Sequence, residues 1–101
     1  MNNLAQLTTY LHKIVSDKRL KPVHFSLTLA ICDTWIKCNF EQPFRVSRSE
    51  LMRASRIRSY ATYHKAIKEL QQSGFLKYTP SYHPVKASTV YLLNEPAITP
   101  L

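Results

Sequence analysis

The residues of this chain that could do chemistry are mainly basic, and they are concentrated in its second half. Residues 45–86 contain nine lysines and arginines but only two acidic residues, so this stretch carries +7 of the formal net charge of +8. Guanidinium and ammonium groups bind phosphates through charge-assisted hydrogen bonds. The serines and threonines of the same stretch can meet phosphates or the edges of nucleobases. The pattern predicts binding to nucleic acid or to another anionic surface.

Catalysis and metal binding find little support among the remaining polar residues. None of the four histidines lies at metal-ligand spacing from a cysteine or from another histidine. A chain with one glycine cannot form a glycine-rich phosphate loop. The acidic residues are scattered, and no nucleophile lies in a recognisable motif. We therefore expect no enzymatic activity, no catalytic residue, no metal and no cofactor.

The two cysteines, Cys32 and Cys38, are six positions apart, which matches neither a redox pair nor a usual zinc motif. On a shared helix their side chains would point apart, so they could not bridge each other. Unpaired cysteines and the lack of a visible secretory leader predict a cytoplasmic protein. The most apolar run, residues 25–36, is too short to span a bilayer, so we expect no membrane partner.

Local signals predict a helix over residues 59–73 in the middle of the basic stretch. Ser59 is a favourable N-cap, and Gly74, the only glycine, is the residue that most easily follows a helix end. Apolar residues recur on one face at i, i+3, i+4 and i+7: Tyr63, Ala66, Ile67 and Leu70.

A shorter helix should precede it. Ser47 and Glu50 have capping-box spacing, and Val46 and Leu51 have the spacing of a hydrophobic staple. A turn over about residues 55–58, anchored by Ile57, would join the two helices. Residues 47–73 are therefore a helix-turn-helix candidate. A strand at 75–78, a turn-rich loop at 79–86 and a strand at 88–93 should follow as a hairpin.

The first half of the chain predicts two helices and a strand. Residues 3–16 have a helical apolar stripe, residues 17–22 form a break, and residues 24–38 form a second helix. That second helix is apolar on two sides, so we expect it at the centre of the domain, with Trp35 in or near the core. Its two faces are Phe25, Leu29, Cys32 and Ile36 on one side and Leu27, Ile31 and Trp35 on the other. Residues 44–46 should form a short strand that pairs with the hairpin.

The second half of the chain resembles the winged helix-turn-helix DNA-binding domain of bacterial regulators. The residues that carry this likeness are Ser47, Glu50, Leu51, Ile57, Ser59, Thr62, Tyr63, Ala66, Ile67, Leu70, Gly74, Phe75 and Leu76. The resemblance implies a mainly helical α+β fold in the order helix, helix, strand, helix, helix, strand, wing, strand. It places a single domain at residues 1–93, a wing at about 75–93, and a loose tail at 94–101. The chain also resembles small basic proteins of conjugative and mobilisable elements.

In such a domain the second helix of the pair enters the major groove of DNA. The resemblance implies that the turn clamps the backbone and that the wing lies along the backbone or in the minor groove. The residues that we expect at the interface are Arg48, Arg53, Arg56, Arg58, Ser59, Tyr60, Thr62, Lys65, Lys68, Tyr82, His83, Lys86 and Ser88. For each single residue, an ordinary solvated surface position remains the alternative.

Two functions follow from this reading. The first is sequence-specific binding of double-stranded DNA by a transcriptional regulator or by an accessory factor of a mobile element. The alternative is a winged-helix adaptor for protein partners, or a component of a replication complex without its own DNA specificity. The extra N-terminal helix could form a homodimer or pack back on its own core, and the sequence leaves both open.

Overall fold

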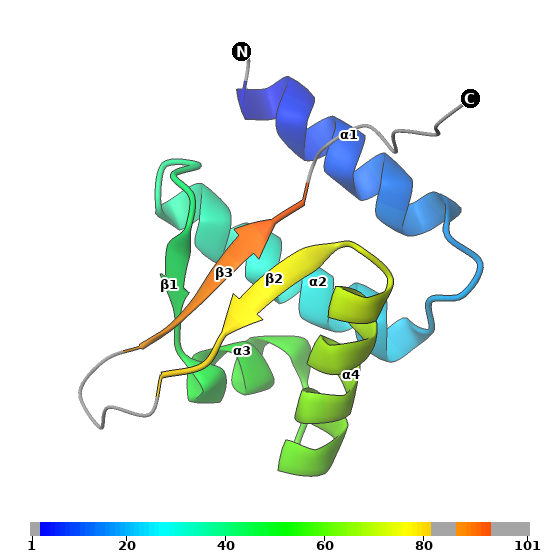
Figure 1. Cartoon of the computed structure of the whole chain (residues 1–101), viewed down its shortest axis with the longest axis vertical. Helices are drawn as coiled ribbons and strands as arrows, with labels where there is room; N and C mark the ends of the chain where they lie inside the picture. The colour runs from blue at the N-terminus through cyan, green and yellow to red at the C-terminus, as the bar shows by residue number, and fades with distance from the viewer. Residues whose placement is uncertain (1–2, 82–86, 94–101) are drawn as a thin grey trace.

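The computed structural model describes residues 3–81 and 87–93, which form four helices and one antiparallel sheet of three strands (Figure 1). The elements in chain order are α1 (Asn3–Ser16), α2 (Pro22–Lys37), β1 (Phe44–Val46), α3 (Arg48–Ser55), α4 (Tyr60–Gln72), β2 (Leu76–Thr79) and β3 (Ser88–Leu92). The predicted mainly helical α+β class is confirmed, and the arrangement is compatible with a winged helix. The predicted tail and residues 82–86 of the predicted wing lie outside the described residues.

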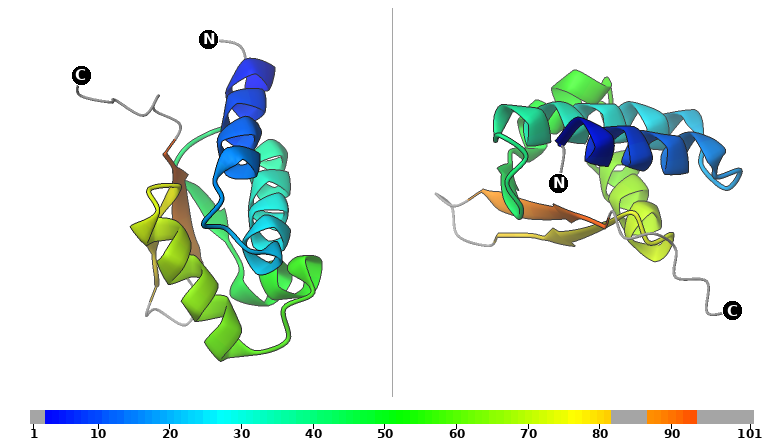
Figure 2. Two further views of the ribbon diagram at one scale, coloured as in Figure 1. Left: turned by 90° about the vertical axis from the view of Figure 1, so that its right-hand side faces the viewer. Right: turned by 90° about the horizontal axis from the view of Figure 1, so that it is seen from above.

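The sheet has the order β1-β3-β2, so β3 is its central strand. The predicted strand at 44–46 is present and pairs with the hairpin, with Phe44 opposite Val90. Side chains of a strand alternate between the two faces of a sheet. The inner face carries buried apolar residues: Phe44, Val46, Leu76, Val90 and Leu92. Helices α1, α2 and α3 lie on this side of the sheet, as the view from above shows (Figure 2).

Helix α2 is the scaffold of the domain, as the sequence predicts. It packs against α1, α3, α4 and β1. Leu27, Ile31 and Trp35 are fully buried along its inner side. The Trp35 ring meets the Phe40 ring edge to face, with 4.9 Å between their centroids.

Two details of α2 differ from the prediction. The helix begins at Pro22 instead of residue 24, because proline fits the first helical position, where its missing N–H has no partner to lose. The prediction of two buried faces was wrong for Leu29 and Ile36, whose side chains are 65% and 42% exposed. Within the described residues no side chain covers this part of α2, and apolar spacing alone cannot show which side is covered.

Helix α1 packs back on the core. Tyr10 and Ile14 are buried, and the Tyr10 hydroxyl donates a 2.9 Å hydrogen bond to the Phe75 carbonyl oxygen just before β2. Burial raises the pKa of Tyr10 well above its ordinary value. Leu4 and Val15, two members of the predicted apolar stripe, remain 65% and 72% exposed.

The capping signals act as predicted at α3 and α4. The Ser47 hydroxyl accepts the Glu50 N–H, and the Ser59 hydroxyl accepts the Thr62 N–H. Gly74 follows α4 with φ of 82°, and a Cβ there would touch no atom within 4 Å. The backbone angle, not space, is therefore what favours glycine at this position.

Candidate nucleic-acid interface

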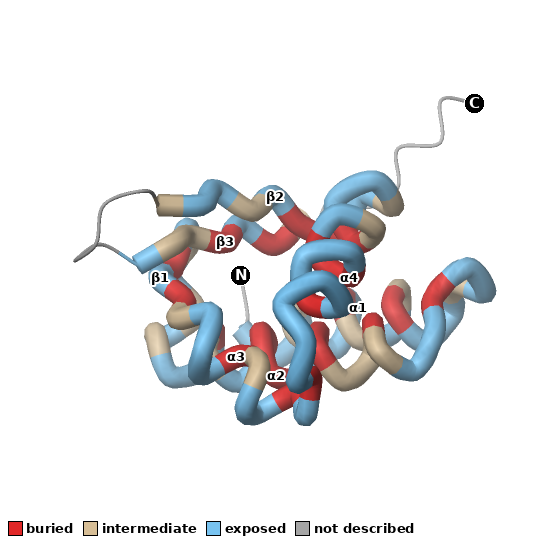
Figure 3. The backbone as a smooth tube through the Cα atoms, turned by 90° about the horizontal axis from the view of Figure 1, so that it is seen from below, coloured by how far each residue is buried: buried red, intermediate tan, exposed pale blue. Residues whose placement is uncertain are grey.

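Helix α4 has one side in the core and one side in solvent. Tyr63, Ala66, Ile67 and Leu70 are buried, as the sequence predicts. The opposite side exposes hydroxyl, aromatic and basic groups along the first turns: Tyr60, Ala61, Thr62, His64, Lys65 and Lys68. The view from below shows the exposed side of α4 beside the sheet (Figure 3). All of the predicted contact residues within α4 are therefore accessible.

The one acidic residue of α4 is held by a partner on α2. Glu69 lies 2.9 Å from Nε2 of the buried His24, through its Oε1 atom. Nδ1 of the same ring accepts the Lys21 N–H at 2.8 Å. Because Nδ1 is an acceptor, the ring hydrogen lies on Nε2, which donates to the carboxylate. The pair links the N-terminus of α2 to the C-terminal half of α4, and the first turns of α4 contain no acidic residue.

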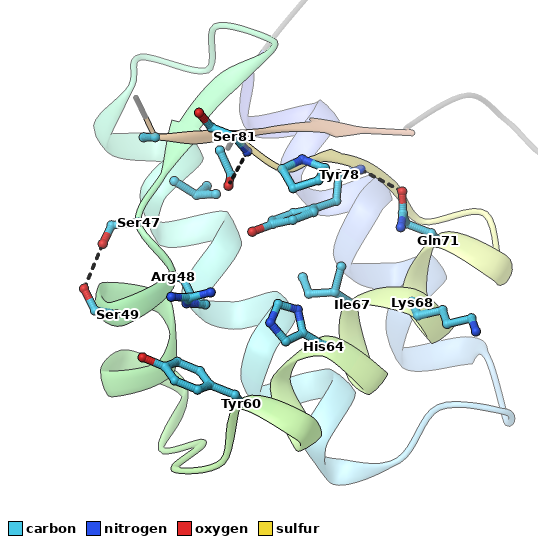
Figure 4. Close-up of a pocket in the computed structure, with 14 residues that line it drawn as sticks. Ser47, Arg48, Ser49, Tyr60, His64, Ile67, Lys68, Gln71, Tyr78 and Ser81 are labelled. Carbon is cyan, nitrogen blue, oxygen red and sulfur yellow. Dashed lines mark hydrogen bonds between the residues drawn. The ribbon is translucent and has the colours of Figure 1, made fainter. Parts of the chain in front are cut away.

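An open pocket of about 750 Å³ separates α4 from the inner side of the β2–β3 hairpin. Predicted contact residues from three elements line it: Arg48, Tyr60, Lys68 and Ser88. Figure 4 shows Arg48 and His64 reaching into this space from α3 and α4, while Lys68 extends along its rim. Three basic side chains thus border one hollow.

Arg48 and Tyr60 form a contact between the starts of α3 and α4. The guanidinium carbon of Arg48 lies 4.4 Å from the centre of the Tyr60 ring, within the range of a cation–π interaction. The Tyr60 side chain is still 60% exposed. The stack holds the arginine at the mouth of the pocket while both groups keep a surface for a ligand.

The far side of α4 borders a second hollow, of about 510 Å³, between the α3–α4 connection and the start of α2. Its lining includes four more predicted contact residues: Arg56, Arg58, Ser59 and Thr62. Arg56 has the left-handed φ of 66°, and its Nη1 atom donates to the carbonyl oxygens of Arg53 and Ala54 at 3.2 and 3.0 Å. Its guanidinium therefore caps the C-terminus of α3, with its other donors still available.

Two predicted contact residues, one on α3 and one on α4, lie outside both hollows. Arg53 and Lys65 are exposed but are not part of the lining of either hollow. Tyr82, His83 and Lys86 lie outside the described residues. Ser88 is half-buried, and its hydroxyl accepts the Ser81 N–H at 3.3 Å. The structure thus gathers eight of the predicted residues into two groups, one on each side of α4.

The pocket also contains residues that were not predicted as contacts. His64 lies one helical turn after Tyr60 and one turn before Lys68, so its spacing could have placed it on the same side. Gln71 follows Lys68 by three residues and has the same signal, whereas Tyr78 has none, because its position depends on how β2 meets α4. The Gln71 side-chain oxygen accepts the Tyr78 N–H at 2.9 Å and fixes that junction.

Two side chains that could act as nucleophiles or acids, Cys32 and Tyr63, are buried. Burial raises the pKa of the Cys32 thiol to about 12, so it is protonated near neutral pH and a poor nucleophile. Burial also raises the pKa of the Tyr63 hydroxyl above its ordinary value. Within residues 3–81 and 87–93, no three histidine, cysteine or acidic side chains are grouped so that they could hold a metal ion.

Comparisons with known proteins add no relative. No protein-family model, no curated protein and no solved structure matches the chain. Among the helices in the described ranges, none has the length and apolar character that crossing a membrane requires.

Proposed function

We propose that this chain is a winged helix-turn-helix protein that binds double-stranded DNA in a sequence-specific manner. The observation that carries the proposal is the exposed side of α4, which is free of acidic groups in its first turns and is flanked by two hollows that contain arginines. Helix α3, the connection and α4 would form the helix-turn-helix, and β2 with β3 would form the base of the wing.

The dimensions of α4 suit a major groove. An α-helix with its side chains is about 10–12 Å across, and the major groove of B-DNA is about 12 Å wide. In this pose Thr62 and Lys65 face the base edges, where hydroxyls bind several groups and lysine binds the acceptors of guanine. Tyr60 lies at the side, where its ring can meet a sugar or a thymine methyl group.

The two hollows would receive the two phosphate strands that border the groove. Arg48, His64 and Lys68 would meet one strand, between α4 and the hairpin. Arg56 and Arg58 would meet the other, at the start of α4. Contacts of this kind fix the register of a protein on the duplex, whereas base contacts carry the sequence preference.

For the biological role, we keep the hypothesis that the sequence supports. We propose a transcriptional regulator, or an accessory DNA-binding factor of a mobile element, that acts in the cytoplasm.

The proposal also includes a homodimer formed through helix α1. Leu4 and Val15 of α1 are strongly exposed, and the half-buried Leu11 between them continues the same helical spacing. Analytical ultracentrifugation of the free protein tests this directly: a monomer at all concentrations would exclude the dimer.

The first test is fluorescence anisotropy with random-sequence duplex DNA over a series of salt concentrations. We expect a Kd near micromolar at low salt, with log K falling linearly against log salt by several units, because several phosphates lose their counterions. Absence of binding at low salt would contradict the proposal. A pull-down with and without nuclease then tests the adaptor alternative, since an adaptor keeps its partner after nucleic acid is removed.

The second test separates contacts to base edges from contacts to phosphates, once a preferred DNA site has been selected. Lys65→Ala should relax the sequence preference, whereas Lys86→Ala should weaken binding to all sequences alike. Lys18→Ala is the matched control, because it removes the same charge from the exposed loop between α1 and α2. If Lys65→Ala and Lys86→Ala both bind like the control, the assignment of this surface is wrong.

A further inference from the structure

The outer face of the sheet is a second surface of defined chemistry. Its residues alternate with the buried ones, and they come from all three strands: Arg45 of β1, Lys77 and Thr79 of β2, and Thr89 and Tyr91 of β3. Helices α1, α2 and α3 lie on the other side of the sheet (Figure 2). This face therefore looks away from the helical layer and is separate from the pocket beside α4.

Tyr91 occupies the centre of that face. It belongs to the central strand, and 45% of its surface is exposed. Lys77 is its direct partner across the β2–β3 pair. A shallow hollow of about 410 Å³ surrounds the ring, with Pro43 and Leu93 as its apolar members. Because Tyr91 points to the outer face of the central strand, its ring cannot fold into the core on the other face.

The charged side chains among the strand residues of this face have one sign. Arg45 and Thr79 both lie opposite Thr89, so Arg45 and Lys77 stand on the two strands that flank Tyr91. None of the five strand residues on this face is acidic. An exposed ring with a lysine directly across one strand pair, and an arginine one register step away on the other flanking strand, matches a ligand that has a flat aromatic group and neighbouring phosphates.

Single-stranded nucleic acid has this chemistry. Unpaired bases stack on aromatic side chains of a sheet while nearby lysines and arginines neutralise the backbone. A duplex does not fit as well, because its bases are stacked on one another and present only their edges in the grooves. An acidic protein would use the two cations but would leave the ring without a partner.

We propose that the outer face of the sheet binds single-stranded nucleic acid, with one base stacked on Tyr91 and the adjacent phosphates held by Lys77 and Arg45. This site does not depend on duplex binding by α4. A protein with both surfaces can hold a duplex and an adjoining unpaired strand at the same time, as a junction or a locally melted site presents them.

The test is anisotropy with a labelled oligothymidylate of about eight nucleotides, compared with an abasic oligomer of the same length. The parent protein should prefer the oligothymidylate. Tyr91→Thr should weaken its binding about tenfold, the scale of one stacked base, while threonine keeps a residue suited to a strand. Tyr91→Phe should bind like the parent. Lys77→Ala should lower the salt slope by about 0.7, the value for one phosphate of a single strand.

Tyr60→Ala is the matched control, because it removes an exposed tyrosine from α4 instead of the sheet. It should leave binding of the oligothymidylate unchanged, and circular dichroism of each variant verifies its fold. The proposal is overturned if the abasic oligomer or polyglutamate binds as tightly as oligothymidylate, or if Tyr91→Thr binds like the parent. It is also overturned if Tyr60→Ala weakens single-strand binding as much as Tyr91→Thr, since one surface would then bind both forms.

Discussion

Helices α2 and α4 are of similar length and lie in contact, but they differ in how many of their residues are buried. Seven residues of α2 are buried, and these include polar residues such as His24 and Thr28. Helix α4 buries only four and leaves its other side to hydroxyl and basic groups. A helix that contacts four other elements holds the fold, whereas a helix with one free side can be used for binding. Changes in α2 should therefore affect stability first, and changes on the exposed side of α4 should affect binding alone.

The largest effect is expected at Trp35. Trp35→Ala should lower the free energy of unfolding by about 3–5 kcal/mol, because the side chain is fully buried and a cavity would remain. Urea unfolding followed by circular dichroism measures this, since the only tryptophan is lost as a fluorescent probe.

Leu29→Ala on the same helix is the control, and its cost should stay within about 0.5 kcal/mol because the side chain is mostly exposed. Lys65→Ala should likewise leave the free energy of unfolding nearly unchanged. A cost for Leu29→Ala close to that of Trp35→Ala would show that the outer side of α2 is covered after all.

The second prediction concerns the link between the two helices. His24→Ala should lower the free energy of unfolding by about 2 kcal/mol, because it removes a buried side chain and leaves the Lys21 N–H and the Glu69 carboxylate without this partner. Glu69→Gln keeps an oxygen acceptor in place and should cost less than half as much. Equal losses in the two variants would mean that the charge of Glu69, not the hydrogen bond, holds α4 on α2. Chemical denaturation of both single variants and of the double variant separates the two terms.

Local signals allowed most of the fold to be predicted. Ser47, Ser59 and Gly74 each mark a helix end through a hydrogen bond or a backbone angle within a few residues, and each acts as predicted. The exposure of Leu29 and Ile36 could not be predicted, because periodicity shows that a helix has an apolar side but not that another element covers it. The pair of His24 and Glu69 joins residues 45 positions apart and has no local signal.

The candidate site was predictable in composition but not in arrangement. The concentration of lysines and arginines after residue 44 indicated which segment would be basic. Their division into two hollows depends on where the start of α2 and the hairpin meet α4. Those meeting points are determined by tertiary packing and have no local sequence signal. The stack of Arg48 on Tyr60 arises in the same way, from the angle between α3 and α4.

The third prediction uses Arg56, where stability and binding should move in opposite directions. Arg56→Gly should raise the free energy of unfolding by about 0.5–1 kcal/mol, because glycine adopts the left-handed angle without the strain of a side chain. The same variant should bind duplex DNA several-fold more weakly if the guanidinium meets a phosphate. Thermal unfolding and anisotropy measure the two effects.

Arg58→Ala is the matched variant for this pair of measurements. It removes an exposed arginine from the same connection at a residue without a left-handed angle, so only binding should fall. A loss of stability in Arg56→Gly would mean that the two hydrogen bonds to the α3 carbonyl oxygens outweigh the backbone strain.

The smallest effect is expected at Asp17, a charged residue beside the scaffold. Hydrogen bonds from Arg19 lower the pKa of Asp17 from 3.8 to about 2. A carboxyl group whose pKa is lower in the folded state stabilises the fold above its unfolded pKa, and this contribution is lost as pH falls from about 4 towards 2. The Arg19 side chain is 64% exposed, so solvent screens the pair and the effect on stability should be small.

The variant Asp17→Asn should therefore be less stable than the parent protein at neutral pH, and this difference in the free energy of unfolding should shrink as pH falls through that window. Urea unfolding at each pH measures the difference. Binding of duplex DNA at neutral pH should be unchanged in this variant, because the pair lies beside the C-terminal end of α4, where Arg19 donates to the Ser73 carbonyl oxygen, and not beside its first turns. A stability gap that stays constant from pH 5 to about 2 would mean that Asp17 acts through its backbone turn and not through its charge.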